Sequence, residues 1–241
     1  MILNFLKSDW LKLKRTYLRW IITVFFILHA VFMVWYSKDL LKLEDFMFSM
    51  YKLFFGSIGV LLPAILGIYI GLSSSIEKNA GNFRNIKGFY FGKTNAILSK
   101  NILINLIFML SIILSTIVFM FGINICYKII LPLKEFIVGI FCFCFSCALI
   151  TSIYIPISIG FSNSICTLLS IGILGLLVTA ILAVVNLGNM IWWLIPYTYA
   201  TFLPVIFCDN FNMFILSLII CIVVTLLILT MIIKFLKVLE K

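Results

Sequence analysis

The chain has 241 residues, of which 64% are hydrophobic and only 11% are charged. A soluble protein of this size is about half apolar and about a quarter charged, so the composition excludes a soluble globular domain and indicates an integral membrane protein. The formal net charge of +10 does not indicate nucleic-acid binding, because no soluble module carries a basic patch and basic residues beside spans orient membrane proteins.

The first segment, residues 1–19, is basic and amphipathic. Its apolar residues recur at spacings of three and four, which places them on one face of a helix. They are Leu3, Leu6, Trp10, Leu13 and Tyr17. The apolar stretch that follows ends without a small-residue cleavage site, so we do not expect a signal peptide. We predict an N-terminal amphipathic interfacial helix; an ordinary basic anchor before the first span is the alternative.

Six long apolar stretches follow, and each is predicted to form a membrane-spanning helix of about 20 residues. The predicted spans are residues 20–36, 53–76, 102–125, 136–159, 165–185 and 214–233. The longest polar interruption is the loop of residues 77–101 between the second and third spans. We therefore predict an all-α, polytopic integral membrane protein with six transmembrane helices and a single membrane domain over residues 1–241.

The second predicted span carries a small residue or a proline at every fourth position. These residues are Gly59, Pro63, Gly67 and Gly71, and they form one ridge along a helix. Small residues allow close helix approach in lipid, where packing replaces the hydrophobic effect. We expect this ridge to pack against another span, in this chain or in a partner, with neighbours satisfying the carbonyl that Pro63 frees.

Basic residues are distributed unevenly between the two sides of this topology. Six spans place both termini and the loop of residues 77–101 on one side, and these segments hold 13 of the 18 Lys and Arg residues. The positive-inside rule then places them in the cytoplasm. We expect a multi-pass protein of the cell membrane with both termini cytoplasmic.

Residues 186–213 form an aromatic segment on the opposite, extracellular side. This segment is too apolar for a free loop, and its Trp and Tyr residues favour the headgroup layer. We predict one or two short interfacial or re-entrant helices, broken near Pro196 and Pro204.

Ionisable groups are confined to loops and the ends of spans. No predicted span interior holds Lys, Arg, Asp or Glu, which argues against an ion-coupled transporter. His29 is the only histidine, so a zinc site is not expected and the residue is predicted to be packed in the first span. Residues 88–94 lack the spacing of a phosphate loop. We therefore expect no cofactor, no metal and no enzymatic activity, and any transport must draw energy from another subunit.

The seven cysteines do not form a metal-binding pattern. Five of them lie inside apolar runs, where cysteine behaves as a small hydrophobic residue. Cys126 and Cys208 lie near span ends on the same predicted side. The sequence leaves open whether these two form a disulfide.

Three segments of the chain form a recognisable combination. They are the basic start SDWLKLKRTYLRW, the inner loop that begins EKNAGNFRN and ends ILSK, and the aromatic stretch WWLIPYTY before the last span. Together they resemble the permease subunit of type-2 ATP-binding-cassette (ABC) exporters. Within that family, the run EKNAGNF and the KLKRT start look like the permeases of lantibiotic self-protection systems.

The resemblance implies roles for two sets of residues. A coupling helix within residues 79–93 would dock into the ATPase through a buried face, and the glycines at 88 and 92 favour a short helix. The residues assigned to coupling are Glu77, Asn79, Phe83, Arg84, Ile86, Lys87 and Tyr90. The residues assigned to an extracellular gate are Trp192, Trp193, Pro196 and Tyr197. A solvated loop with incidental aromatic residues is the alternative for the first set.

The function that the resemblance implies is that of the membrane-spanning permease subunit of an ATP-driven transporter that expels a membrane-active peptide. Its expected partners are an ABC ATPase, a second six-span permease, the lipid bilayer and an amphipathic peptide cargo. One alternative is an ABC permease for other antibiotics. Another is a non-transporting immunity protein embedded in the membrane, which would protect the cell without an ATPase.

Overall fold

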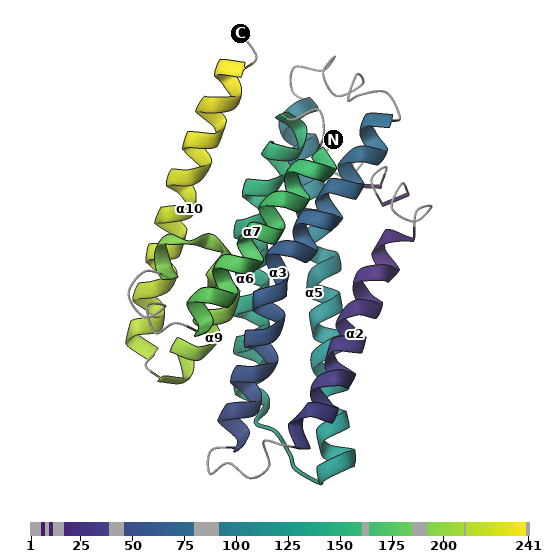
Figure 1. Ribbon diagram of the computed structural model, residues 1–241, viewed down its shortest axis with the longest axis vertical. Helices are drawn as coiled ribbons and strands as arrows, with labels where there is room; N and C mark the ends of the chain where they lie inside the picture. The colour runs from purple at the N-terminus through teal and green to yellow at the C-terminus, as the bar shows by residue number, and fades with distance from the viewer. Residues whose placement is uncertain are drawn as a thin grey trace.

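The computed structural model describes residues 6–7, 10–11, 17–38, 46–79, 92–160, 164–184, 192–209 and 211–239. The described part is helical and contains no strand. Its main helices are α2 (Leu18–Tyr36), α3 (Phe46–Asn79), α5 (Gly92–Tyr127), α6 (Leu133–Gly160), α7 (Ser164–Val184), α9 (Tyr199–Asp209) and α10 (Phe211–Leu239). Figure 1 shows a bundle of long helices with α2 at one edge and α10 at the other.

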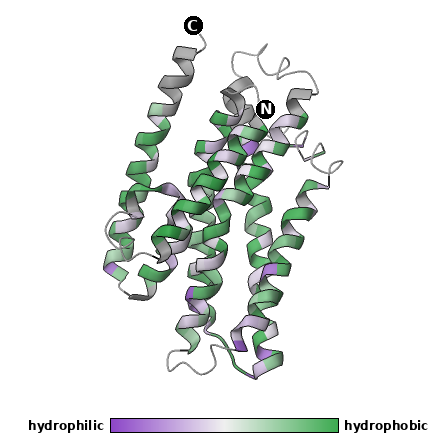
Figure 2. Ribbon diagram, in the orientation of Figure 1, coloured by the Kyte–Doolittle hydropathy of each residue, from purple (hydrophilic) through white to green (hydrophobic). Residues whose placement is uncertain are grey.

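Five of the described helices contain a stretch that is long and apolar enough to cross a membrane. The stretches are Phe46–Ile76, Leu98–Tyr127, Leu133–Ser158, Ile165–Leu182 and Phe211–Met231. Figure 2 shows that hydrophobic residues dominate the length of these helices. Many of their Leu, Ile and Phe side chains are exposed on the outside of the bundle, as expected where lipid replaces water. The fold is therefore that of an all-helical, multi-pass membrane protein.

The apolar stretch of α2, Trp20–Tyr36, is shorter than the other five. Hydrogen bonds nevertheless join α2 to α5 along most of its length. They link Thr23 Oγ1 and Ser111 Oγ (3.1 Å), Ser115 Oγ and the Phe26 carbonyl (2.9 Å), and Tyr127 Oη and the Val34 carbonyl (3.1 Å). Polar contacts of this kind hold helices together in lipid, so α2 is an integral part of the bundle.

The helices extend beyond the predicted spans. α3 begins at Phe46, inside the predicted link before residue 53, and it ends at Asn79. α5 begins at Gly92, so helix continues into both ends of the predicted loop of residues 77–101, although the apolar stretch of α3 ends at Ile76, where the predicted span ends. Hydropathy marks only the part of a helix that lies in lipid. The backbone hydrogen bonds of the helix do not depend on apolar side chains, so the helix can continue into a polar flank.

The predicted helix break at Pro204 is also wrong, because α9 continues through this residue. Pro204 lies in the second turn of the helix, where its missing N–H deprives only the Ala200 carbonyl of a helical donor. A short 3₁₀ helix, η3 (Pro196–Thr198), does begin at Pro196, where the prediction placed a helix break.

α3 has an aromatic face and a small-residue face. Aromatic rings pack the space that α3 shares with α2, α5 and α6. The fully buried rings are Phe26, Tyr51, Phe54, Phe55, Tyr69, Phe108, Phe119, Phe136 and Phe143. Phe54 stacks on Phe119 with ring centroids 4.5 Å apart. Large side chains therefore separate α3 from α5, whereas the opposite face of α3 permits close helix contact.

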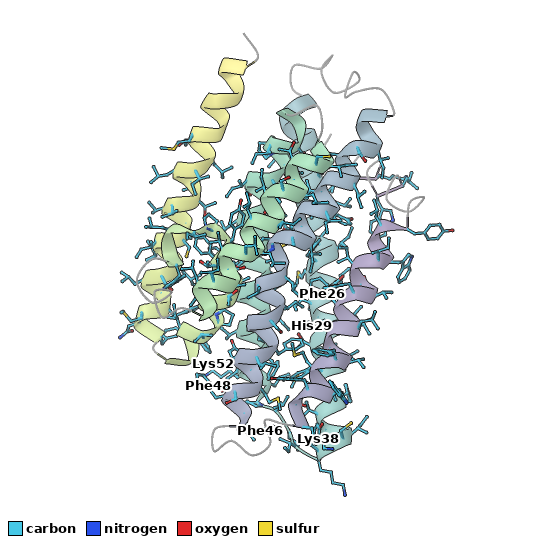
Figure 3. The ribbon with its side chains drawn as sticks, viewed as in Figure 1. Phe26, His29, Lys38, Phe46, Phe48 and Lys52 are labelled. Carbon is cyan, nitrogen blue, oxygen red and sulfur yellow. The ribbon has the colours of Figure 1, made fainter. Side chains whose placement is uncertain are left out.

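His29 lies on the inner side of α2, between this helix and α3, as Figure 3 shows. Its Nε2 atom is 2.9 Å from Ser57 Oγ, and that hydroxyl donates to the Leu53 carbonyl at 2.7 Å. With the serine proton on the Leu53 carbonyl, the serine oxygen accepts from Nε2, and this arrangement uses the tautomer protonated at Nε2. His29 is thus a packed interhelical residue, the role that its sequence context predicted.

Candidate functional site

α3 and α7 cross with almost no side chain between them. A methyl group at Gly67 would lie 2.5 Å from the Leu168 carbonyl oxygen, and one at Gly172 would lie 2.9 Å from the Pro63 carbonyl oxygen. The obstacles are backbone atoms, which cannot rotate away as a flexible side chain can. The small-residue ridge of α3 is therefore the place where the two helix backbones meet.

The same ridge also receives α9. A methyl group at Gly59 would lie 2.8 Å from backbone atoms of Ala200 and Thr201. Pro63 and Gly71 are buried as well. Three of the four residues that the sequence placed on a packing ridge thus make close contacts within this chain. Pro63 and Gly67 contact α7, and Gly59 contacts α9.

Between α7 and α10 the described residues 192–209 pack against the bundle. The Tyr197 ring lies against Gly175, where an added methyl group would be 3.1 Å from the ring. Gly175 lies about 13 Å along the helix axis from Val184, the last residue of α7. From this depth α9 runs back to Asp209. We refer to residues 192–209 as the hairpin, and to its inner end, residues 192–198, as the apex.

Several backbone groups of the apex form hydrogen bonds within the apex itself. Irregular backbone at membrane depth survives only where protein or water pairs its N–H and C=O groups. The Thr198 hydroxyl lies 2.6 Å from the Trp192 carbonyl and 2.8 Å from the Ile195 carbonyl. The amides of Ile195 and Thr198 bond the same two carbonyls at 3.1 and 3.0 Å. The apex is therefore a tight, self-capped turn.

Trp192 anchors the hairpin. Its side chain is only 6% exposed and stacks on Phe202 with ring centroids 5.8 Å apart. It also meets Tyr199 edge-on at 6.3 Å. These rings pack in a second hydrophobic cluster with Phe214 of α10 and Cys142 of α6. The indole therefore fixes the hairpin between α6 and α10.

The predicted gate residues come together at the apex. Pro196 is buried, and Tyr197 is half-buried between Gly175 and Tyr154 of α6, with the two tyrosine centroids 6.0 Å apart. A methyl group at Gly175 would also lie 2.8 Å from Pro63 Cβ. Pro63 of the predicted packing ridge and Tyr197 of the predicted gate thus both lie against Gly175 of α7. The side chain of Trp193 lies outside the described residues.

The predicted coupling segment falls largely outside the described residues. Phe83, Arg84, Ile86, Lys87 and Tyr90 all lie in residues 80–91, of which the structure gives no description. Glu77 and Asn79 lie in the last turn of α3, and their side chains are likewise not described. What the structure describes is the pair of helices that leads into this segment and out of it.

A buried lysine joins these two helices. Lys100 is 6% exposed, and its Nζ donates to Ser74 Oγ of α3 at 3.1 Å. A buried ammonium group is tolerated only where hydrogen-bond partners surround it. The contact therefore ties α5 to α3 close to both ends of the predicted coupling segment. Sequence reasoning placed Lys100 in a loop and missed this role.

A polar network continues from Lys100 toward α6. Asn101 Nδ2 donates to Ser152 Oγ at 3.2 Å, and Asn105 Nδ2 donates to Thr151 Oγ1 at 3.1 Å. Thr151 Oγ1 in turn donates to Asn101 Oδ1 at 2.9 Å. The pair Asn101 and Asn105, one helical turn apart in an apolar run, was the available signal for this network. It fixes α5 to α6 at the same end of the bundle.

The cysteines and other potential ligands make no further site in the described part of the chain. Cys126 is an exposed free thiol, and the side chain of Cys208 lies outside the described residues. The described His, Cys, Asp and Glu side chains form no group of three that could hold a metal ion.

No protein-family model matches the chain, and comparisons with curated proteins and with solved structures also found no match. The functional argument therefore depends on the sequence features and on the geometry described above.

Proposed function

We propose that the chain is the membrane-spanning permease subunit of an ATP-driven transporter that expels a membrane-active peptide, as in lantibiotic or bacteriocin self-protection. The observation that carries the proposal is the arrangement of two specialised ends on one helical bundle. The aromatic hairpin, residues 192–209, packs against one end. At the other end, α3 and α5 are joined by the hydrogen bond between Lys100 and Ser74. These two helices lead into and out of the basic connecting segment, residues 80–91.

In this proposal α2 is the sixth span. Its apolar stretch of 17 residues spans about 26 Å, a little less than the roughly 30 Å of a lipid core. Trp20 and Trp35, near its two ends, are 55% and 72% exposed, and tryptophan anchors helices at the two membrane interfaces. Residues 1–19 then lie on the cytoplasmic surface, and both termini are cytoplasmic in the cell membrane.

The connecting segment is the proposed contact for the ATPase. α3 and α5 contain 34 and 36 residues, which corresponds to about 51 and 54 Å of helix and exceeds the lipid core. Their ends therefore carry residues 80–91 beyond the bilayer. The Lys100–Ser74 contact and the Asn101 network link these ends to α6, so a force on the segment would move three helices together.

The proposed transporter contains an ABC ATPase and a second six-span permease. The cargo is an amphipathic peptide that reaches the subunit from the bilayer, which fits the apolar exterior of the described helices. The hairpin apex, with Trp192, Pro196 and Tyr197, is the proposed gate on the extracellular side.

Phe83→Asp is expected to abolish co-purification of the ATPase. The substitution places a charge on the face that Phe83, Ile86 and Tyr90 share at helical spacing, and a charge buried without a partner is strongly unfavourable. Membrane insertion should be unchanged. The measurement is the amount of ATPase recovered with the tagged, detergent-solubilised chain.

Asn85→Asp is the matched control, because residue 85 lies on the opposite side of the same helical wheel and gains the same charge. ATPase recovery should remain at the level of the unsubstituted chain. Normal recovery with Phe83→Asp, or equal loss with both variants, would contradict the assignment of the coupling face.

A further inference from the structure

Lys100 lies just inside the apolar part of α5, and its partner Ser74 lies just inside the apolar part of α3. The apolar stretch of α5 begins at Leu98, and that of α3 ends at Ile76. Each of the two bonded residues is therefore two positions from a polar flank, about 3 Å along the helix. Their hydrogen bond of 3.1 Å is buried, and Lys100 is 6% exposed.

An ammonium group at this place costs stability. Removing a charged group from water is unfavourable unless its partners compensate, and well-packed apolar side chains of similar size are often as stable or more stable in such positions. Methionine would fill the space of Lys100 without a charge. The lysine therefore calls for a property that methionine lacks.

That property is a second favourable position for the charged end of the side chain. Lysine has a flexible four-carbon stem, and lysines near the ends of membrane helices extend their ammonium groups to the interface. From two positions inside the apolar stretch, the ammonium group of Lys100 can reach the polar flank by rotation of this stem. Lys100 therefore has a buried state, bonded to Ser74, and a hydrated state in which this bond no longer joins α5 to α3.

The bond connects two pairs of helices that are held together by other contacts. α5 is held to α6 by the hydrogen bonds of Asn101. α3 meets α7 through backbone atoms at Gly67. Neither set of contacts includes Lys100 or Ser74, so the bond between these two residues can break while both pairs stay intact.

Aromatic rings hold the two pairs together at the opposite end of the bundle. Phe54 of α3 stacks on Phe119 of α5 with ring centroids 4.5 Å apart, and both rings also pack against a ring of α6. Phe54 is 20 residues from Ser74, about 30 Å along α3. This cluster keeps α3, α5 and α6 together when the bond to Ser74 breaks, so separation is confined to the end beside residues 80–91.

We propose that Lys100 is a latch between the helix pairs α3–α7 and α5–α6. In the closed latch its ammonium group bonds Ser74. In the open latch the ammonium group is hydrated, and the ends of α3 and α5 beside residues 80–91 separate. This inference rests on the proposed function in one respect, because the ATPase opens the latch by moving residues 80–91. Lys100 is thus a positioning residue for energy coupling.

The first test is thermal unfolding of the purified chain in mild detergent. Lys100→Met should leave the unfolding midpoint unchanged or raise it, because a buried charge is removed. Ser74→Ala should lower the midpoint by several degrees, because the ammonium group loses this acceptor. The same substitution should have no effect in the Lys100→Met background and should again lower the midpoint in the Lys100→Arg background, which keeps a cationic donor.

Ser73→Ala is the matched control for the unfolding test. Ser73 is also buried, but its hydroxyl donates to the Ile70 carbonyl of its own helix at 3.1 Å. Its effect should be the same with and without Lys100→Met. An equal effect of Ser74→Ala in the unsubstituted and Lys100→Met backgrounds would overturn the latch.

The second test measures the reaction of Lys100 with a membrane-impermeant reagent that acetylates amines, sulfosuccinimidyl acetate. The chain is embedded in lipid nanodiscs, and the products are quantified by mass spectrometry. Lys134, which is exposed at the opposite end of the bundle, is the internal reference. Ser74→Ala should increase the labelling of Lys100 severalfold, and Ser73→Ala should leave it unchanged. Equal labelling of Lys100 in the unsubstituted chain and both variants would show that the hydrated state does not exist.

The role in coupling is tested on the complex recovered with the ATPase. Labelling of Lys100, relative to Lys134, should rise severalfold during ATP hydrolysis. If the ATPase co-purifies but the labelling of Lys100 does not depend on ATP, the latch is wrong and the transporter proposal stands. If no ATPase co-purifies, the transporter proposal and the ATP-driven opening both fail, and the labelling of the isolated chain decides whether Lys100 has two states.

Discussion

Replacing Gly67 with alanine is expected to destabilise the bundle by about 1–3 kcal/mol, the usual cost of overpacking a well-packed core. The added methyl group would lie 2.5 Å from the Leu168 carbonyl oxygen and close to the Cα atom of Gly172. Both are backbone atoms of α7, so the two helices must separate along their contact. The measurement is thermal unfolding of the purified chain in mild detergent, where the midpoint should fall by several degrees.

Gly56→Ala is the matched control, because Gly56 belongs to the same helix and a methyl group there would meet nothing within 4 Å. Alanine has a higher helix propensity than glycine by about 1 kcal/mol, so this variant should be neutral or more stable. Equal midpoints for the two variants would show that the close crossing of α3 and α7 does not contribute to stability.

Trp192→Ala is expected to have the largest effect of any single truncation in the hairpin, about 3–5 kcal/mol. The indole is buried against Phe202 and Tyr199 and joins the cluster that includes Phe214. Its removal leaves a cavity between α6 and α10 and frees the apex. The hairpin should become sensitive to proteolysis, and export of the proposed peptide cargo should be lost.

The control is Trp35→Ala, which makes the same change at a side chain that is 72% exposed on the outer face of α2. It truncates an exposed side chain and leaves no internal cavity, so the unfolding midpoint should change little. Limited proteolysis and thermal unfolding are measured on both variants. A similar small effect of the two substitutions would mean that Trp192 does not hold the hairpin in place.

The sequence predicted the long helices well because an apolar run of about 20 residues matches the thickness of a lipid core and exceeds what a buried helix of a soluble protein needs. It also predicted a close packing ridge on α3 from the spacing of Gly59, Pro63 and Gly67, since every fourth residue lies on one side of a helix. Which helix this ridge meets was not predictable. The partner, α7, has Gly172 and Gly175 at the contact, and only the tertiary arrangement shows that they face Pro63.

The sequence did not reveal how deep the aromatic segment lies. Its Trp and Tyr content fits an interfacial helix and a re-entrant one equally well. The depth is set by contacts that are distant in the chain, between Tyr197 and both Gly175 and Tyr154. For the same reason the buried state of Lys100 was missed, because its acceptor Ser74 lies on another helix.

The most direct test of the proposed function is a pull-down of the tagged, unsubstituted chain from its native membranes in mild detergent, followed by identification of the proteins that co-purify. The proposal predicts that an ABC ATPase and a second six-span membrane protein are recovered in stoichiometric amounts. Recovery of the chain alone, without an ATPase, would contradict the transporter proposal and favour an immunity protein that binds its peptide without transport.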